Sequence, residues 1–273
     1  MNIALHETTK MQLRALSAQK PQALLLFGQE GSGLKTLALE TAKEWGKLLE
    51  VVEPVAKTKS SLPAISVEIV RTLYERTRMK LDADHTVVID DADLMSDAAQ
   101  NAFLKLLEEP AGYIHFILTS HRPESLLATI RSRVQSIHVQ PLDDATSSRL
   151  LRTLGVTDEK VKAQLLFIAK GLPAELSRLA SNKDYLEQKG ETVRLARDFV
   201  RASTYQKLII AQKVASSRQN ALIFIDDVML LLKKTVDVSA DERSLQLLDK
   251  LIEAKEHIAA NANVRLQLAS VVI

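Results

Sequence analysis

Short apolar runs that alternate with helical patterns constrain the first half of this chain more than any other feature. The runs occupy residues 23–27, 49–52, 86–89, 113–119 and 137–139, and helical patterns at 36–48, 66–77 and 96–109 lie between them. An apolar run without polar alternation is typical of a strand that is buried on both faces. Alternating strands and helices therefore predict an α/β fold, with a parallel sheet and helices on both of its faces.

The strand signal disappears after Pro141, and the rest of the 273 residues has helical patterns. Three short patterns at 142–154, 159–169 and 174–179 are followed by longer amphipathic ones at 187–202, 205–216, 221–234 and 241–261. We predict three domains from this change. They are an α/β nucleotide-binding-like domain at 1–141, a small three-helix lid at 142–183 and an all-helical oligomerisation domain at 184–273.

Composition excludes several classes of protein. The chain has no cysteine, which excludes disulfides and thiolate zinc sites. A net charge of only +2 leaves nucleic-acid contact to a local basic face, and 4% aromatic residues disfavour a stacking platform for single strands. No segment approaches the ~20 apolar residues of a membrane span, and residues 1–20 do not form a signal peptide. We therefore expect a cytoplasmic protein without membrane contact.

A glycine-rich loop, GQEGSG at residues 28–33, follows the first apolar run. In a standard phosphate loop a lysine and then a Ser or Thr come next, to bind the phosphates and Mg²⁺. Here Leu34 comes next, and Lys35 and Thr36 follow one position late. One position rotates a helical side chain by ~100°, so we expect Lys35 to point away from the phosphates. The loop either keeps only its shape or binds nucleotide weakly, through Gly28, Gly31, Gly33, Lys35 and Thr36.

An acidic cluster ends the apolar run at residues 86–89. Asp90 and Asp91 follow it directly, at the edge of the sheet where open α/β folds bind their ligands. Asp90 is placed to hold Mg²⁺ through oxygen, if a nucleotide binds. Asp91 stands where related ATPases usually carry a glutamate that orients water, and its shorter side chain makes that role doubtful. A solvated acidic loop is the alternative interpretation.

The sequence from residue 87 to 139 resembles the AAA+ subunits of the bacterial DNA polymerase III clamp loader, the gamma/tau and delta-prime subunits. The resemblance rests on the acidic strand end, on LLEEP at 106–110 and on TIRSR at 129–133. Further similarity at residues 51–71 and in NANVRLQL at 261–268 extends it over nearly the whole chain. It implies an AAA+ P-loop-type sheet followed by a three-helix lid and a helical collar.

The resemblance also implies a role. Such subunits form a ring through their C-terminal helices, and the ring opens a sliding clamp and places it on primed DNA. The expected partners are gamma/tau-like and delta-like subunits, the clamp and the DNA. Neighbouring subunits supply an arginine to each other's ATP, and Arg133 in Ser132-Arg133-Val134 matches that position. Leu268 is expected to be an exposed position of the assembly surface.

Three departures make the chain most similar to the delta-prime branch, which donates an arginine but does not hydrolyse ATP. They are Leu34 at the lysine position, Asp91 at the glutamate position and Ala174 at a second sensor position. The first sensor would lie within residues 119–121. No cofactor is certain: ATP and Mg²⁺ would bind weakly, and the family's four-cysteine zinc module is missing. One alternative is an ATP-hydrolysing gamma/tau-like motor with a displaced Lys35-Thr36 pair. A Holliday-junction motor is a third, disfavoured by the all-helical C-terminal end.

Overall fold

We describe the chain from a computed structural model that covers residues 3–56, 63–77, 83–108, 113–239 and 242–272. It separates into two compact units, Met1–Ser181 and Asn182–Ile273. The domain boundaries predicted after residues 141 and 183 both remain predictions. The helix end expected at Pro110 lies outside the described residues.

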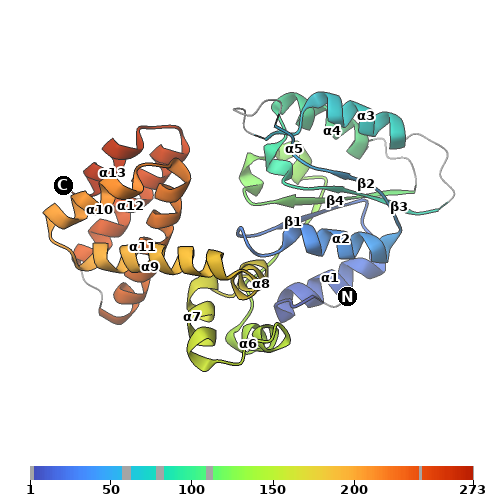
Figure 1. Ribbon diagram of the computed structural model, residues 1–273. Coiled ribbons are helices and arrows are strands. Elements are labelled where there is room, and N and C mark those ends of the chain that lie inside the picture. Colours follow the sequence, from blue (N-terminus) through green and yellow to red (C-terminus); the bar gives the residue numbers. More distant parts are fainter. Residues whose placement is uncertain (1–2, 57–62, 78–82, 109–112, 240–241, 273) are drawn as a thin grey trace. The chain divides into compact units, whose positions relative to one another are not determined.

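The first unit is built on a five-stranded parallel sheet (Figure 1). Its strands are β1 (Ala23–Phe27), β2 (Lys47–Val52), β3 (His85–Ile89), β4 (Ile114–Ser120) and β5 (Gln135–His138). Their order is β2-β3-β4-β1-β5. The central strands β3, β4 and β1 are almost completely buried, which explains their continuous apolar runs. The predicted α/β class is confirmed.

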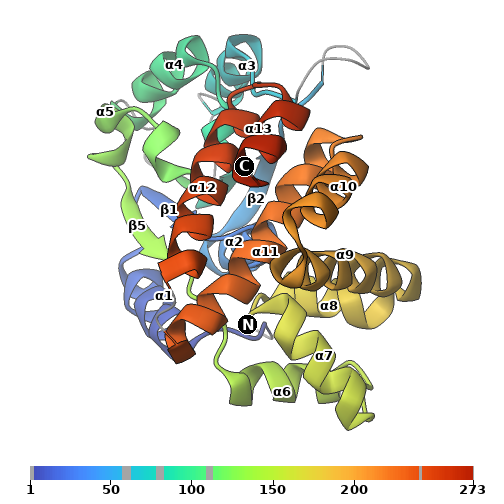
Figure 2. The ribbon, with the colours of Figure 1, turned by 90° about the vertical axis from the view of Figure 1, so that its left-hand side faces the viewer.

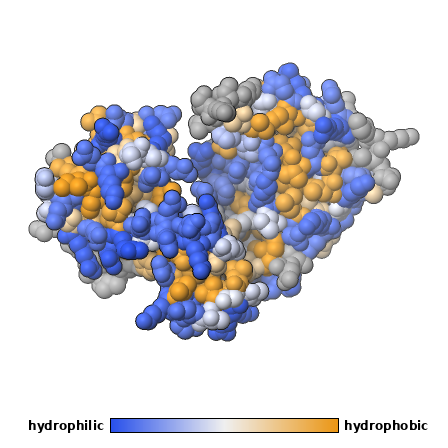
Figure 3. Space-filling view, viewed as in Figure 1, coloured by the Kyte–Doolittle hydropathy of each residue, from blue (hydrophilic) through white to orange (hydrophobic). Residues whose placement is uncertain are grey.

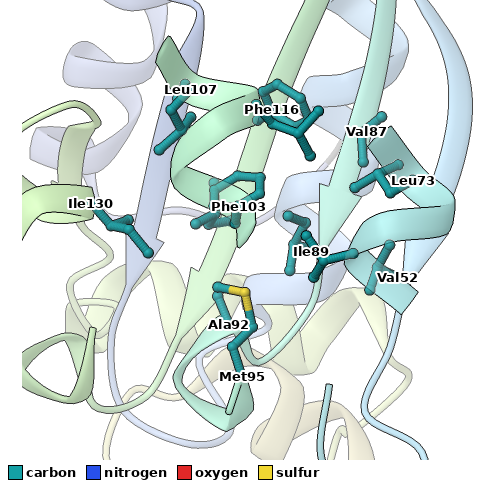
Figure 4. Close-up of a cluster of buried hydrophobic side chains, with 14 of the residues drawn as sticks. Val52, Leu73, Val87, Ile89, Ala92, Met95, Phe103, Leu107, Phe116 and Ile130 are labelled. Carbon is teal, nitrogen blue, oxygen red and sulfur yellow. The ribbon is translucent and has the colours of Figure 1, made fainter. Parts of the chain in front are cut away.

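Helices cover both faces of this sheet (Figures 1 and 2). They are α1 (Glu7–Gln19), α2 (Leu34–Trp45), α3 (Val67–Thr77), α4 (Asp97–Glu108) and the short α5 (Ala128–Arg131). Leu25 of β1 packs into the same cluster as Phe103 of α4, which Figure 4 shows with its neighbours. Leu24 and Leu26 belong instead to the cluster that contains Leu37 of α2. Alternate residues of one strand thus pack on opposite faces of the sheet.

Two local features differ from the sequence expectations. The helix expected over 36–48 ends at Trp45, and Leu48 lies inside β2. Gly46 separates the two elements, and a Cβ there would lie 2.7 Å from the carbonyl carbon of Asp84. Only glycine fits this approach, so the chain leaves the helix here. Helix α1 was not predicted, because its weak amphipathic pattern buries only Thr9 and Leu13.

Three short helices complete the first unit, close to the positions expected for the lid. They are α6 (Asp144–Thr153), α7 (Glu159–Ala169) and α8 (Pro173–Ser181). Each contributes a leucine that is completely buried, namely Leu151, Leu165 and Leu176. Asp143 and Asp158 cap α6 and α7 by accepting backbone N–H bonds, which fixes where these helices begin.

The second unit is entirely helical in its described residues. It contains α9 (Lys183–Arg201), α10 (Thr204–Val214), α11 (Arg218–Ser239), α12 (Glu242–Ala259) and α13 (Val264–Val272). Helix α11 packs against α9 and α12, and α13 packs against α10 and α12. Phe224 of α11 is fully buried, with its ring edge-on to Phe199 at 5.3 Å. The helical C-terminal part is confirmed.

Leu268 is not the exposed residue that the sequence suggested. Its side chain is 2% exposed and belongs to the core of the second unit, whereas Leu266 on the same helix is 68% exposed. Side chains two positions apart on a helix differ by ~200° in direction, so Leu266 and Leu268 face nearly opposite sides. No helix in the described part of the chain is long and apolar enough to cross a membrane.

Candidate functional site

The glycine-rich loop at residues 28–33 connects β1 to the N-terminus of α2. Gly31 and Gly33 have φ angles of 86° and 79°, a region that favours glycine. Gly28 is required for a different reason, because a Cβ there would lie 2.9 Å from the carbonyl oxygen of Val139. The three glycines therefore shape a turn that places backbone groups at the start of a helix.

The start of helix α8 contacts this loop directly. The carbonyl oxygen of Gly31 accepts the backbone N–H of Ala174 at 2.9 Å and that of Glu175 at 3.3 Å. These are the second and third residues of α8, and two of its orphan N–H groups are satisfied in this way. Ala174, which the sequence analysis expects at the second sensor position, faces Gly33, where a Cβ would lie 3.8 Å from the Cβ of Ala174. A methyl group can provide no charge to a phosphate.

Lys35 points to the acidic strand end and not into the glycine loop. Its Nζ lies 3.3 Å from Oδ2 of Asp90 and also donates a bond to the carboxylate of Glu53. The bond with Glu53, and after it the bond with Asp90, raises the pKa of Lys35 above 10.5 against the opposing effect of burial. Lys35 is thus a charged ammonium that bridges two carboxylates. Thr36 is exposed at the next position of α2.

Asp90 is held by β4 as well as by Lys35. Its Oδ1 accepts a hydrogen bond of 2.7 Å from the hydroxyl of Thr119, and the same hydroxyl accepts the backbone N–H of Asp91 at 2.9 Å. Thr119 is fully buried and Asp90 is 9% exposed. Sequence reasoning placed Thr119 only within the expected first-sensor segment at 119–121, and it missed Glu53 as a site residue. The available signal was sheet order, since residues that follow neighbouring parallel strands meet at one edge.

Asp91 adopts a left-handed conformation, with φ of 48°. Its Oδ1 lies 3.6 Å from Nε2 of His121, whose Nδ1 is 2.8 Å from the carbonyl oxygen of Gly28. His121 therefore links the acidic end to the glycine loop. Burial, and after it the charge of Asp90, raises the pKa of the Asp91 carboxyl above its ordinary 3.8. The site holds this carboxylate in an unfavourable environment.

Replacing Asp91 with asparagine is expected to stabilise the protein at neutral pH by less than about 1 kcal/mol, because solvent screens the charge. A raised folded pKa means that folding favours the protonated form, so wild-type stability declines as pH rises from 3.8 through the folded pKa. Asparagine removes that loss and tolerates the left-handed backbone. Urea unfolding of the wild type and of Asp91→Asn at pH 7 and at pH 3 measures the difference in unfolding free energy. An equal gain in stability at the two pH values would contradict the electrostatic cause.

Arg133 contacts other residues than those of the glycine loop and the acidic strand end. Its Nη2 is 2.9 Å from Oε1 of Glu108 at the end of α4, and its Nη1 donates to the carbonyl oxygen of Thr129 at 3.1 Å. Its side chain is 40% exposed. Gln100 fixes the segment before α5, because its buried amide accepts the N–H of Leu127 at 2.7 Å and donates to the carbonyl oxygen of Ser125 at 3.1 Å. The guanidinium is thus held at the surface in a defined direction.

The side chains as they stand do not fit a Mg²⁺ ion. Both oxygens of Asp90 already have partners, Thr119 on one and the Lys35 ammonium on the other. Mg²⁺ requires oxygen ligands at about 2.0–2.1 Å, and an ammonium provides none. Within the described residues, no group of three or more His, Cys, Asp or Glu side chains could hold a metal. In this arrangement a positive side chain contacts the oxygen Oδ2 of Asp90.

Comparison with known families gives a match that spans both the sheet and the site. The family model described as "DNA polymerase III, delta subunit" matches residues 6–143. The delta-prime subunit of DNA polymerase III from Pseudomonas aeruginosa is 29% identical over 204 residues, which cover 64% of this chain and 60% of that one. The Escherichia coli delta-prime subunit is 42% identical over 86 residues, 31% of this chain and 25% of that one. Both matches span less than two thirds of those relatives.

Solved structures show the same fold at low identity. A DNA polymerase III gamma-subunit-related protein from Thermotoga maritima superposes with a TM-score of 0.52 and 20% identity, over 97% of both chains. The Holliday-junction motor RuvB of the same organism, in a mutant form, superposes with a TM-score of 0.54 and 14% identity, over 79% of this chain and 83% of that one. These similarities establish the AAA+ fold and do not by themselves indicate a function.

Proposed function

Since this chain belongs to the DNA polymerase III delta-subunit family of clamp-loader AAA+ proteins, we propose that it is a delta-prime-like subunit that does not hydrolyse ATP. Its role is to complete the loader ring and to supply Arg133 to the ATP of a neighbouring subunit. Its partners are gamma/tau-like and delta-like subunits, and together they place a sliding clamp on primed DNA.

The position of Arg133 carries this proposal. The guanidinium is exposed, is held by Glu108 and Thr129, and makes no contact with the glycine loop in the described part of its own chain. A guanidinium at a subunit surface can stabilise the negative charge that develops on a γ-phosphate held by the neighbour. The bond to Glu108 fixes its direction before the neighbour arrives, which lowers the entropy lost when the arginine is engaged.

The chain's own site supports the other half of the proposal. Leu34 occupies the lysine position and is 3% exposed, Ala174 provides no charge, and Lys35 is paired with carboxylates. The gamma/tau-like motor remains the second candidate. Saturable ATP binding by the isolated chain that is lost in Lys35→Ala would favour that motor.

Reconstitution tests the proposed role. The chain is mixed with the gamma/tau and delta subunits of its own organism, and size-exclusion chromatography with light scattering measures assembly. Clamp loading on primed DNA is then measured with and without the chain. One particle that contains every subunit, and clamp loading that depends on this chain, is the expected result. A complete and active loader that leaves the chain unbound would refute the proposal.

Replacing Leu266 with aspartate is expected to weaken that assembly. Leu266 is 68% exposed on α13, and Figure 3 shows hydrophobic residues at the surface of this helical unit among hydrophilic ones. Burying a leucine in an interface contributes about 1.5–3 kcal/mol, so the dissociation constant should rise roughly 10- to 100-fold. Met11→Asp is the matched control, because Met11 is 64% exposed in the first unit. Equal affinities of both variants would place the interface elsewhere.

A further inference from the structure

Lys35 occupies a position that normally belongs to a ligand of a metal. Counting from Gly28, the phosphate-loop pattern places its lysine at residue 34 and its Ser or Thr at residue 35. In P-loop ATPases the hydroxyl at the latter position and the aspartate at a strand end hold Mg²⁺ between them. In this chain those two positions are Lys35 and Asp90, and they contact each other directly at 3.3 Å.

The contacts of the ammonium match those expected of a bound cation. It contacts Oδ2 of Asp90 and the carboxylate of Glu53, while Thr119 supplies the bond to Oδ1 of Asp90. One positive charge lies against two negative ones, so the ion pair offsets much of the acidic charge at the strand end. Asp90 is only 9% exposed, and a buried carboxylate of this kind needs a partner.

We propose that the Lys35 ammonium is a built-in substitute for the divalent cation, and that it keeps the acidic strand end in one metal-independent state. A lysine side chain is charged at neutral pH, so the contact with Asp90 is that of a cation with a carboxylate. The biological meaning of the inference rests on the proposed non-hydrolysing role, but its chemistry requires only the isolated chain. Such a subunit keeps the same strand-end geometry whether nucleotide and metal are present or absent.

Metal binding to the isolated full chain tests the proposal, with Mn²⁺ as a paramagnetic probe in place of Mg²⁺. Electron paramagnetic resonance measures bound Mn²⁺ with and without ATP. The wild type is compared with Lys35→Thr and with the double variant Leu34→Lys/Lys35→Thr, which restores the standard motif. The control is Lys43→Thr, because Lys43 lies on the same helix and pairs with Glu40 at the surface.

Wild type and Lys43→Thr are expected to bind no Mn²⁺ at millimolar concentration, and the double variant is expected to bind it in the presence of ATP. A divalent ion and an ammonium about 4 Å apart in water repel each other enough to change the affinity for the ion roughly 30-fold. The affinity of the double variant for Mn²⁺ should exceed that of the wild type by at least this factor. Mg²⁺ should also raise the Tm of Lys35→Thr and leave the wild-type Tm unchanged.

Two outcomes would overturn the inference. In the first, the wild type binds Mn²⁺ as tightly as the double variant, so the ammonium does not exclude the metal. In the second, both Lys35 variants fold, as circular dichroism reports, and yet bind no metal and show no Mg²⁺-dependent Tm. Neither outcome affects the reconstitution test, so failure here can be distinguished from failure of the proposed subunit role.

Discussion

Replacing Arg133 with alanine is expected to reduce ATP hydrolysis at the neighbouring site by about 10³-fold, the lower end of the effect of arginine fingers. The change removes the planar fork that, in the proposed role, contacts transition-state charge on the γ-phosphate. Folding should change little, because the pair of Arg133 with Glu108 is largely solvent-exposed and such pairs contribute about 0–1 kcal/mol. Single-turnover hydrolysis in a reconstituted ring, stimulated by clamp and primed DNA, measures the effect.

Two companion variants make this result specific. Arg131→Ala is the matched control, since Arg131 lies two residues earlier at the end of α5, is exposed and carries the same charge. Arg133→Lys keeps the charge but loses the bidentate geometry, and we expect it to recover only part of the rate. Unchanged hydrolysis by Arg133→Ala, or an equal loss by Arg131→Ala, would remove the proposed role of Arg133.

Two aromatic pairs with the same geometry allow the cores of the two units to be compared. Phe103 meets Phe116 in the first unit, and Phe199 meets Phe224 in the second, both edge-on at 5.3 Å and 89°. Phe103→Ala and Phe224→Ala should each reduce the unfolding free energy of the unit concerned by about 3–5 kcal/mol. This is a large part of the ~5–15 kcal/mol that stabilises a typical domain.

The single tryptophan separates the two effects. Trp45 is 1% exposed in the first unit, so its fluorescence follows the unfolding of that unit, while circular dichroism follows all helices. Phe103→Ala should shift the fluorescence transition to lower urea, and Phe224→Ala should shift only part of the dichroism transition. Phenylalanine-to-leucine versions, with smaller losses, serve if an alanine variant does not fold. A fluorescence shift in Phe224→Ala as large as in Phe103→Ala would mean that both units unfold together.

The elements of the first unit were largely predictable, because the strands are buried on both faces. The run at residues 23–27 was predicted to its exact ends, while the helix at 36–48 was extended too far, because Gly46 acts through a close approach to Asp84. That approach joins distant parts of the chain and leaves no local pattern. Gln100 of α4 is buried and held by its hydrogen bonds, which helical periodicity cannot reveal.

The candidate site was predictable in its residues more than in its contacts. The glycine loop, Asp90 and Asp91 follow from position at strand ends. The direction of Lys35 could not be obtained from the rotation of one helical position, because a long flexible side chain reaches whichever charge lies nearest. Its partner Glu53 follows β2, and Thr119 lies in β4. Only the sheet order brings these residues to the end of β3.

The sequence by itself determined the fold class and which residues stand at the motif positions, because apolar periodicity and residue identity at fixed motif positions are local properties. The tertiary structure decided what those residues contact. It placed the Lys35 ammonium against Asp90 and Glu53, and it paired Arg133 with Glu108. It also showed that Leu266 is the exposed leucine of the last helix, whereas Leu268 is buried. Each outcome depends on the direction of a side chain relative to a distant segment, and packing alone fixes that direction.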